Sequence, residues 1–410
     1  MLAKLPAYKR TTQVGLAMTA MLSFVLVVAV FRAMPSATGN PSNPASVPLN
    51  IQASGELLRT SGASFPQREP KNVGVALLEN ADNRMVQLFD LTTGLTKETF
   101  SVATYPMAVT RSTRNEILVS DAVVLNTEIL IDFGKRGLKP PPGVRDERLL
   151  ILDSANLVLK RTIPLQDRIN YKLYTSAVAL SNSERYLYYL TVDKQVVVVD
   201  LDGVADLGTR ASLPAGCGRA LLSALGPDYI IAACPDSGDV QIIDQAGTVR
   251  EQNFFSGDER GLYTDVPAQQ KNTVRVNAGF LTPAGQIGGI LATGTLMFKN
   301  TDGSLSSVQA IPRGRVAVGQ TYQLDPAHLL VAYRTYGEDT IAGFVVFNLS
   351  SMKMERDVTL AEDALWVVPN GPSAALVLRK SGFVDVTDFR SDKVRSIKTN
   401  IDAYNSVLIP

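Results

Sequence analysis

A run of apolar residues that ends in Asp or Asn recurs along the chain. Each copy is followed by a turn and then by a second strand-like stretch in which polar and apolar residues alternate. The spacing of roughly 40 to 50 residues is typical of the blades of a β-propeller. The pattern therefore predicts an all-β, seven-bladed β-propeller. The seven copies are Met85–Asp90, Leu149–Asp153, Val196–Asp200, Val240–Asp244, Thr295–Asn300, Val345–Asn348 and Val384–Asp388.

A second repeated strand, built of small or alternating residues, precedes most of these copies. It occurs once more at the C-terminal end, at Asn405–Pro410, but no copy is found before residue 72. Because open sheet edges expose unpaired backbone groups, we expect the C-terminal strand to pair with Val73–Leu78 and close the ring. Two β-sandwiches, which also consist of short regular strands, are the alternative. The six internal copies are Met107–Val109, Ser176–Asn182, Arg219–Leu222, Arg275–Phe280, Val316–Gln320 and Ala364–Pro369.

The N-terminal part of the chain has a different pattern. Val14–Phe31 is an uncharged apolar run, at the short end of what spans a bilayer as a helix. Three basic side chains precede it, and the positive-inside tendency then places the N-terminus in the cytoplasm. We expect a cytoplasmic segment at 1–13 and one transmembrane signal anchor at 14–32. A cleaved signal peptide is the alternative, although no small-x-small cleavage site follows the run.

Residues 33–71 are rich in Pro, Ser, Ala, Gly and Asn and contain few apolar side chains that could pack. Such a composition predicts a linker between the membrane and the folded domain. The propeller is then expected at 72–410, on the periplasmic or extracellular side of a single-pass membrane protein. A loop that lies on the propeller is the alternative for residues 50–70.

Composition supports a large folded domain and excludes one class of partner. The chain has 410 residues, of which 45% are hydrophobic and 19% charged, so a sizeable core is expected. The net charge is +1, and the part of the chain after the apolar run has slightly more acidic than basic residues. A nucleic-acid partner is not expected, because such proteins carry a clustered basic surface. The expected partners are the membrane and other protein subunits of a membrane or envelope complex.

An insertion lengthens the second blade. Residues 134–145 contain three consecutive prolines, which no strand accommodates, so this segment is expected to be an exposed basic loop. Long loops in compact domains are often functional. A partner contact is one interpretation, and a passive insertion is the other. The basic residues of this possible partner-binding loop are Lys135, Arg136, Lys139 and Arg145.

The chain has two cysteines, Cys217 and Cys234, and both fall in one blade. Adjacent antiparallel strands would bring them face to face, and an outward-facing domain lies in a compartment that permits a disulfide. We expect this disulfide, with two free buried thiols as the alternative.

The sequence indicates no catalytic, cofactor-binding or metal-binding residues. The one histidine, His328, follows a turn and is expected to face solvent, and no His or Cys cluster offers a transition-metal site. Phosphate-loop, dinucleotide and nucleophile-elbow motifs are missing from the sequence. The Asn348 sequon coincides with a repeat position and is interpreted as structural. These observations favour a protein that is not an enzyme.

The stretch from about Met107 to Gly247 resembles the heavy chain of methylamine and aromatic amine dehydrogenases, a seven-bladed propeller, and the wider YVTN-type group of bacterial propellers. The elements that carry the resemblance are Arg145–Asp153, Leu157–Leu165, and Tyr174–Ser176 running into Val196–Asp200. The segments around Cys217 and Cys234 resemble the paired cysteines that this family carries within one blade. In that family the heavy chain is a scaffold, and the tryptophan-derived quinone belongs to a separate small subunit. The resemblance therefore implies no catalytic residues in this chain.

Three functions follow as hypotheses. The first is a membrane-anchored, extracytoplasmic propeller that acts as a non-catalytic binding or scaffold subunit of an envelope complex. The second is the heavy subunit of a periplasmic quinoprotein amine dehydrogenase, which passes electrons to a partner protein. The third is a propeller hydrolase that resembles lactonases.

Overall fold

The computed structural model describes residues 72–79, 84–102, 107–124, 145–170, 177–203, 205–258, 273–389 and 393–410, with a few isolated positions in 128–136 and at 391. The expected transmembrane anchor at 14–32 and the whole of the expected linker at 33–71 lie outside these ranges. Within them, no helix has the length and apolar composition that crossing a membrane requires.

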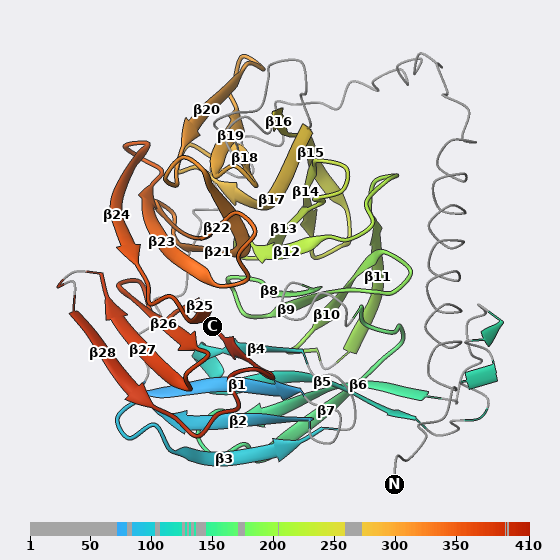
Figure 1. Cartoon of the computed structure of the whole chain (residues 1–410). Helices are drawn as coiled ribbons and strands as arrows, with labels where there is room; N and C mark the ends of the chain where they lie inside the picture. The colour runs from blue at the N-terminus through green and yellow to red at the C-terminus, as the bar shows by residue number, and fades with distance from the viewer. Residues whose placement is uncertain are drawn as a thin grey trace, which may run out of the picture. The chain divides into compact units, whose positions relative to one another are not determined.

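The described strands form seven antiparallel sheets that are arranged as the blades of a β-propeller (Figure 1). The predicted all-β, seven-bladed fold is confirmed. Blade 5 has five strands, and each of the other sheets has four. The helical structure with stated bounds in the described part is one 3-10 turn, η1 (Ser112–Arg114).

In each four-stranded sheet the strands follow one another from the inner strand outward. Blade 1 consists of β29 (Ser406–Ile409), β1 (Val73–Glu79), β2 (Arg84–Asp90) and β3 (Thr96–Ser101). Blade 2 consists of β4 (Ala108–Arg111), β5 (Glu116–Val124), β6 (Arg145–Asp153) and β7 (Leu159–Leu165). Blade 3 consists of β8 (Val178–Leu180), β9 (Tyr186–Leu190), β10 (Gln195–Asp200) and β11 (Ala205–Ser212). Blade 4 consists of β12 (Leu221–Ala224), β13 (Tyr229–Ala233), β14 (Asp239–Asp244) and β15 (Val249–Phe254).

The remaining blades follow the same order, except that blade 5 begins with a short extra strand. Blade 5 consists of this strand, β16 (Ser256–Asp258), and of β17 (Thr273–Leu281), β18 (Ile287–Leu291), β19 (Thr295–Lys299) and β20 (Leu305–Gln309). Blade 6 consists of β21 (Arg315–Asp325), β22 (His328–Thr335), β23 (Ile341–Asn348) and β24 (Lys353–Thr359). Blade 7 consists of β25 (Ala364–Pro369), β26 (Ala374–Arg379), β27 (Phe383–Asp388) and β28 (Lys393–Lys398).

The repeated motifs occupy equivalent places in every blade. The apolar runs that end in Asp or Asn form the strand next to the outer edge, from β2 in blade 1 to β27 in blade 7. The second repeated strand of the sequence is the inner strand. The inner strands contact one another in the order β4, β8, β12, β17, β21, β25 and β29, and β29 in turn contacts β4.

The first and last strands of the described domain share one sheet. β29 pairs with β1 in antiparallel register, with Val75 opposite Ile409 and Leu77 opposite Val407. Side chains of both neighbouring blades reach the same strand. Trp366 Nε1 of β25 donates to the Leu408 carbonyl at 2.9 Å, and Thr110 Oγ1 of β4 donates to the Pro410 carbonyl.

The Asp or Asn that ends each repeated strand organises the turn that follows. Asp90 Oδ1 accepts from the backbone amides of Thr92 and Thr93, at 2.6 and 3.1 Å. Lys97 on the next strand approaches Asp90 Oδ2 at 2.8 Å. The hydrogen bond from Lys97, followed by those from the two amides, holds the pKa of Asp90 well below its usual range. The repeat signal is therefore turn chemistry.

Asn348, at the same position of blade 6, has the same role. Its Oδ1 accepts from the amides of Ser350 and Ser351, at 2.8 and 2.9 Å, and its Nδ2 donates to Glu355 at 2.6 Å. This agrees with the structural interpretation of the sequon position.

Within blades 1 and 5, an aromatic ring lies over a glycine that it faces on the neighbouring strand of the same sheet. A Cβ atom added to Gly74 would lie 2.2 Å from Phe89 Cζ, and one added to Gly288 would lie 2.1 Å from Phe280 Cζ. Both rings are buried. Glycine is required at these two positions because the neighbouring ring occupies the space of a side chain.

Candidate functional site

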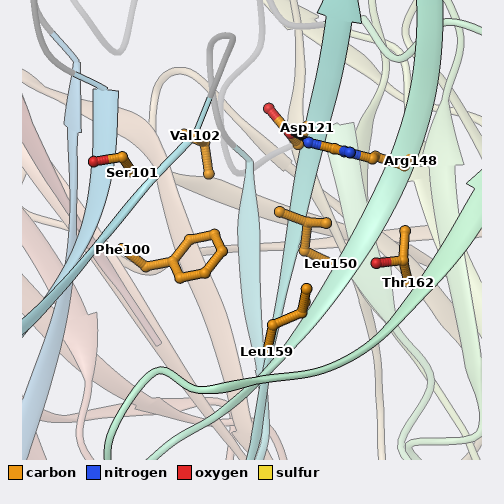
Figure 2. Close-up of a pocket in the computed structure, with 8 residues that line it drawn as sticks. All are labelled: Phe100, Ser101, Val102, Asp121, Arg148, Leu150, Leu159 and Thr162. Carbon is orange, nitrogen blue, oxygen red and sulfur yellow. Dashed lines mark hydrogen bonds and ion pairs between the residues drawn. The ribbon is translucent and has the colours of Figure 1, made fainter.

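A groove lies between the outer parts of blades 1 and 2 (Figure 2). It has a volume of about 390 Å³, within the range of about 300–1,000 Å³ that ligand pockets occupy. Blade 1 contributes the end of β3 and the residue after it, and blade 2 contributes β5, β6 and β7. The lining residues are Phe100, Ser101, Val102, Asp121, Arg148, Leu150, Leu159 and Thr162.

The apolar part of the groove continues the core between the two blades. Leu150 is buried, and Phe100 and Val102 pack against the cluster to which it belongs. Figure 2 shows the Phe100 ring facing Leu150, with Leu159 near the same space. Leu159 is 45% exposed, and its neighbour Val158 is 60% exposed. Apolar surface therefore extends from the buried core to solvent at this edge.

One end of the groove carries an ion pair between adjacent strands. Asp121 of β5 lies opposite Arg148 of β6 in the sheet register. Arg148 donates to Asp121 Oδ2 twice, from Nε at 2.9 Å and from Nη2 at 2.6 Å. The Asp121 side chain is 1% exposed, whereas that of Arg148 is 38% exposed. The buried carboxylate therefore fixes the plane of a guanidinium that is still accessible from the groove.

The predicted basic loop is described at only some of its residues. Lys135 and Arg136 are exposed, and Arg136 forms an ion pair with Asp132 at 2.8 Å. Lys139 lies outside the described residues. Arg145 is the first residue of β6 and lies opposite Val124. The partner contact of this loop stays a prediction. The loop connects β5 to β6, the two strands that carry Asp121 and Arg148.

His328, which is expected to face solvent, is partly exposed and lies between two carboxylates. It begins β22, its side chain is only 30% exposed, and its Nδ1 lies 2.8 Å from Asp325 Oδ2. Glu355 Oε2 of β24 lies 3.4 Å from its Nε2. Asp325 is three residues away in sequence, but Glu355 reaches the ring only through strand pairing, so the sequence alone did not indicate this second contact. Among the described residues, no serine hydroxyl forms a hydrogen bond with His328.

A buried glutamate joins blades 2 and 3 on another side of the molecule. Glu184, in the turn between β8 and β9, is fully buried. Its two carboxylate oxygens accept from the amide and hydroxyl of Ser112 and from those of Thr113, the first two residues of η1. We call this arrangement the Glu184 clamp. Its carboxylate has donors on both oxygens, as a structural group does.

The predicted disulfide is confirmed. Cys217 and Cys234 are bonded, with Cα atoms 5.4 Å apart, and both are buried in blade 4. Cys234 follows β13 directly, and Cys217 lies in the turn region before β12. The bond therefore fixes the segment that enters blade 4 to the end of its second strand.

Comparison with known proteins does not assign this chain to a family. No model of a known protein family matches the chain. No curated protein matches it either. The resemblance to amine dehydrogenase heavy chains thus rests on the residues quoted for it and on the propeller fold.

Proposed function

We propose that this protein is a membrane-anchored, extracytoplasmic seven-bladed propeller that acts as a non-catalytic binding subunit of an envelope complex. The observation that carries the proposal is the groove between blades 1 and 2. It combines an exposed apolar side chain, Leu159, with a fixed guanidinium, whereas other charged groups of the domain, such as Asp90 and Glu184, serve turns and blade contacts. We further propose that the C-terminal strand closes the ring, as its pairing with β1 supports.

The location is supported by the sequence and by the disulfide. The basic residues before Val14–Phe31 favour an N-terminus in the cytoplasm, so that the propeller lies on the opposite side of the membrane. A buried disulfide fits an oxidising compartment.

A second candidate function is the heavy subunit of a quinoprotein amine dehydrogenase. The specific observation in its favour is the Cys217–Cys234 bond within one blade, as in the family that the sequence resembles. This function requires a separate small subunit with a tryptophan-derived quinone and an electron-accepting partner protein.

Co-purification from native membranes tests the proposed function. After crosslinking and extraction of the full chain in mild detergent, we expect a stoichiometric envelope protein, identified by mass spectrometry. A quinone-dependent redox stain on a small co-purifying subunit would favour the amine dehydrogenase function instead. A chain that migrates as a monomer, with no crosslinked protein, would contradict both.

The state of the cysteines tests the location. In an unreduced digest of native membranes, we expect the peptides of Cys217 and Cys234 to be linked. Replacing both cysteines with alanine should lower the free energy of unfolding by about 2–5 kcal/mol. The control is the chain expressed without residues 1–33, which stays in the cytoplasm and should contain free thiols before purification. Free thiols in the native membranes would show that the propeller does not face an oxidising compartment.

A further inference from the structure

The groove between blades 1 and 2 has the features of a specific docking surface. Its apolar part is formed by Phe100, Leu150 and Leu159, which come from three strands in two blades. Leu150 belongs to the buried core, Phe100 is half-buried and Leu159 is exposed, so apolar surface is continuous from the core to solvent at this point. A partner site in this groove rests on the proposed binding function and specifies where the partner binds.

Arg148 determines which polar group of a ligand can be bound in the groove. Its Nε and Nη2 both donate to Asp121, and its Nη1 donates to no residue within the described ranges. Since the guanidinium is held by a buried partner, its remaining N–H groups keep a fixed direction. Figure 2 shows the ion pair beside the apolar side chains, so one ligand can reach both.

The charge of the ion pair favours a neutral acceptor. The negative charge of Asp121 offsets part of the positive charge of Arg148, which weakens the attraction of the guanidinium for an anion. A peptide carbonyl accepts a hydrogen bond without depending on that attraction. A partner segment with a carbonyl next to an apolar side chain matches the groove in charge and in polarity.

The backbone beside the groove also suits an extended segment. β3 and β7 are the outer strands of their sheets, and each has one sheet neighbour in the part of the chain that the structure describes. Outer strands bind extended peptides through the unpaired side of their backbone. Phe100 lies on β3 and Leu159 lies on β7, so the apolar part of the groove is formed by residues of these two outer strands.

We propose that this groove binds an extended segment of a partner protein. An apolar side chain of the segment lies against Phe100, Leu150 and Leu159, and a backbone carbonyl of the segment accepts a hydrogen bond from Arg148. The proposed site consists of residues on β3, β5, β6 and β7 and does not require the basic loop.

Peptide display tests this site with the full chain in detergent. Random-sequence peptides displayed on phage are selected, and an enriched peptide is synthesised with a fluorescent label. We expect Leu159→Glu to weaken its binding at least tenfold, as measured by fluorescence anisotropy. The matched control is Leu305→Glu, because Leu305 begins the outer strand of blade 5 and is 54% exposed. Both variants should unfold at the same denaturant concentration as the unchanged chain, since both positions are exposed.

A second variant separates a neutral acceptor from an anion. In Asp121→Asn the guanidinium loses its anchor and the site gains positive charge. We expect the selected peptide to bind more weakly to this variant, provided that its unfolding midpoint shows a folded domain. Tighter binding would mean that an anion occupies the site and would overturn the assignment to a peptide carbonyl.

Other results would also overturn the proposal. One is equal binding of the selected peptide by the unchanged chain and by Leu159→Glu. Another is a selection that yields no binding peptide, together with binding of the fatty acid decanoate in the groove. That result would indicate that the groove binds a small amphiphile and not a peptide segment. The failure of this site is distinguishable from failure of the proposed function. If Leu159→Glu retains its co-purifying envelope protein, the binding function stands, but its surface lies elsewhere.

Discussion

Deletion of residues 402–410 is expected to leave the propeller unable to fold stably. The deletion removes β29, so β1 loses the hydrogen-bonded partner along one side. It also removes Leu408 and Ile409, which are 0% and 4% exposed. Each contributes about 1.5–3 kcal/mol if fully buried. The neighbouring blades would lose the acceptors of the Trp366 and Thr110 side chains as well.

The expected loss is comparable to the whole stability of a domain. Net stabilities are usually about 5–15 kcal/mol, and an exposed β1 edge favours aggregation. The truncated chain should therefore aggregate or be degraded, as shown by its soluble yield and by limited proteolysis. Deletion of residues 34–42, a linker segment of equal length, is the control and should have little effect. A truncated chain with the unfolding midpoint of the intact protein would contradict closure by the C-terminal strand.

Two point variants test the same strand without removing it. Leu408 is fully buried, so Leu408→Ala should lower the free energy of unfolding by about 2–5 kcal/mol. Val407, the preceding residue, is only half-buried, so Val407→Ala should have a smaller effect. Urea unfolding of the purified full chain measures both. Equal effects at the two positions would show that Leu408 is not packed as described.

The features that the sequence predicts depend on local patterns. Each apolar run has the length of a strand, and the Asp or Asn that ends it forms hydrogen bonds within the turn that follows, as Asp90 does with the amides of Thr92 and Thr93. These interactions involve residues close in sequence, and their repetition identified the blades. The pairing of β29 with β1 was predictable for another reason, since the repeat has one inner strand too few at its start and one too many at its end.

The groove was not predicted, because its residues come from separate repeats. Phe100 and Leu150 are far apart in sequence and meet only when blades 1 and 2 pack. One local signal was present. Asp121 is a charged residue within the apolar strand β5, and the register of the hairpin places Arg148 opposite it. The short extra strand with which blade 5 begins, β16 (Ser256–Asp258), was also not predicted. Three residues are too few to show a recognisable alternation of polar and apolar positions.

Replacement of Glu184 is expected to destabilise the contact between blades 2 and 3 far more than replacement of an exposed glutamate would. The clamp links residues 71 and 72 positions apart, so no sequence pattern indicates it. Its four donors are two amides, whose oxygen distances are 3.0 and 2.8 Å, and the two hydroxyls of Ser112 and Thr113. Amides at the start of a helical turn have no acceptor within that turn. The Glu184 carboxylate of blade 3 supplies the acceptor for the Ser112 and Thr113 amides of blade 2.

The size of the effect follows from the loss of hydrogen bonds to a charged, buried carboxylate. A hydrogen bond to a charged group contributes about 1.5–3 kcal/mol, and the donors on η1 are only partly buried, so Glu184→Ala should lower the free energy of unfolding by about 3 kcal/mol. Glu184 has a φ of 56°, a left-handed conformation that glycine adopts without strain. Glu184→Gly should therefore be less destabilising than Glu184→Ala, by about 1 kcal/mol. The control is Glu338→Ala, an exposed glutamate in the turn between β22 and β23, which should change stability by less than about 0.5 kcal/mol.

A double-mutant cycle separates the clamp from a general loss of packing. In the Ser112→Ala background, Glu184→Ala should cost less than it does in the unchanged chain, because one of the four donors is already gone. The free energies of unfolding of the four chains give the coupling directly, and residues in one hydrogen-bond network typically couple by about 0.5–3 kcal/mol. Strictly additive effects would mean that the Glu184 carboxylate does not hold η1. The contact between blades 2 and 3 would then depend on their shared apolar core, in which Leu180 and Leu118 are buried together.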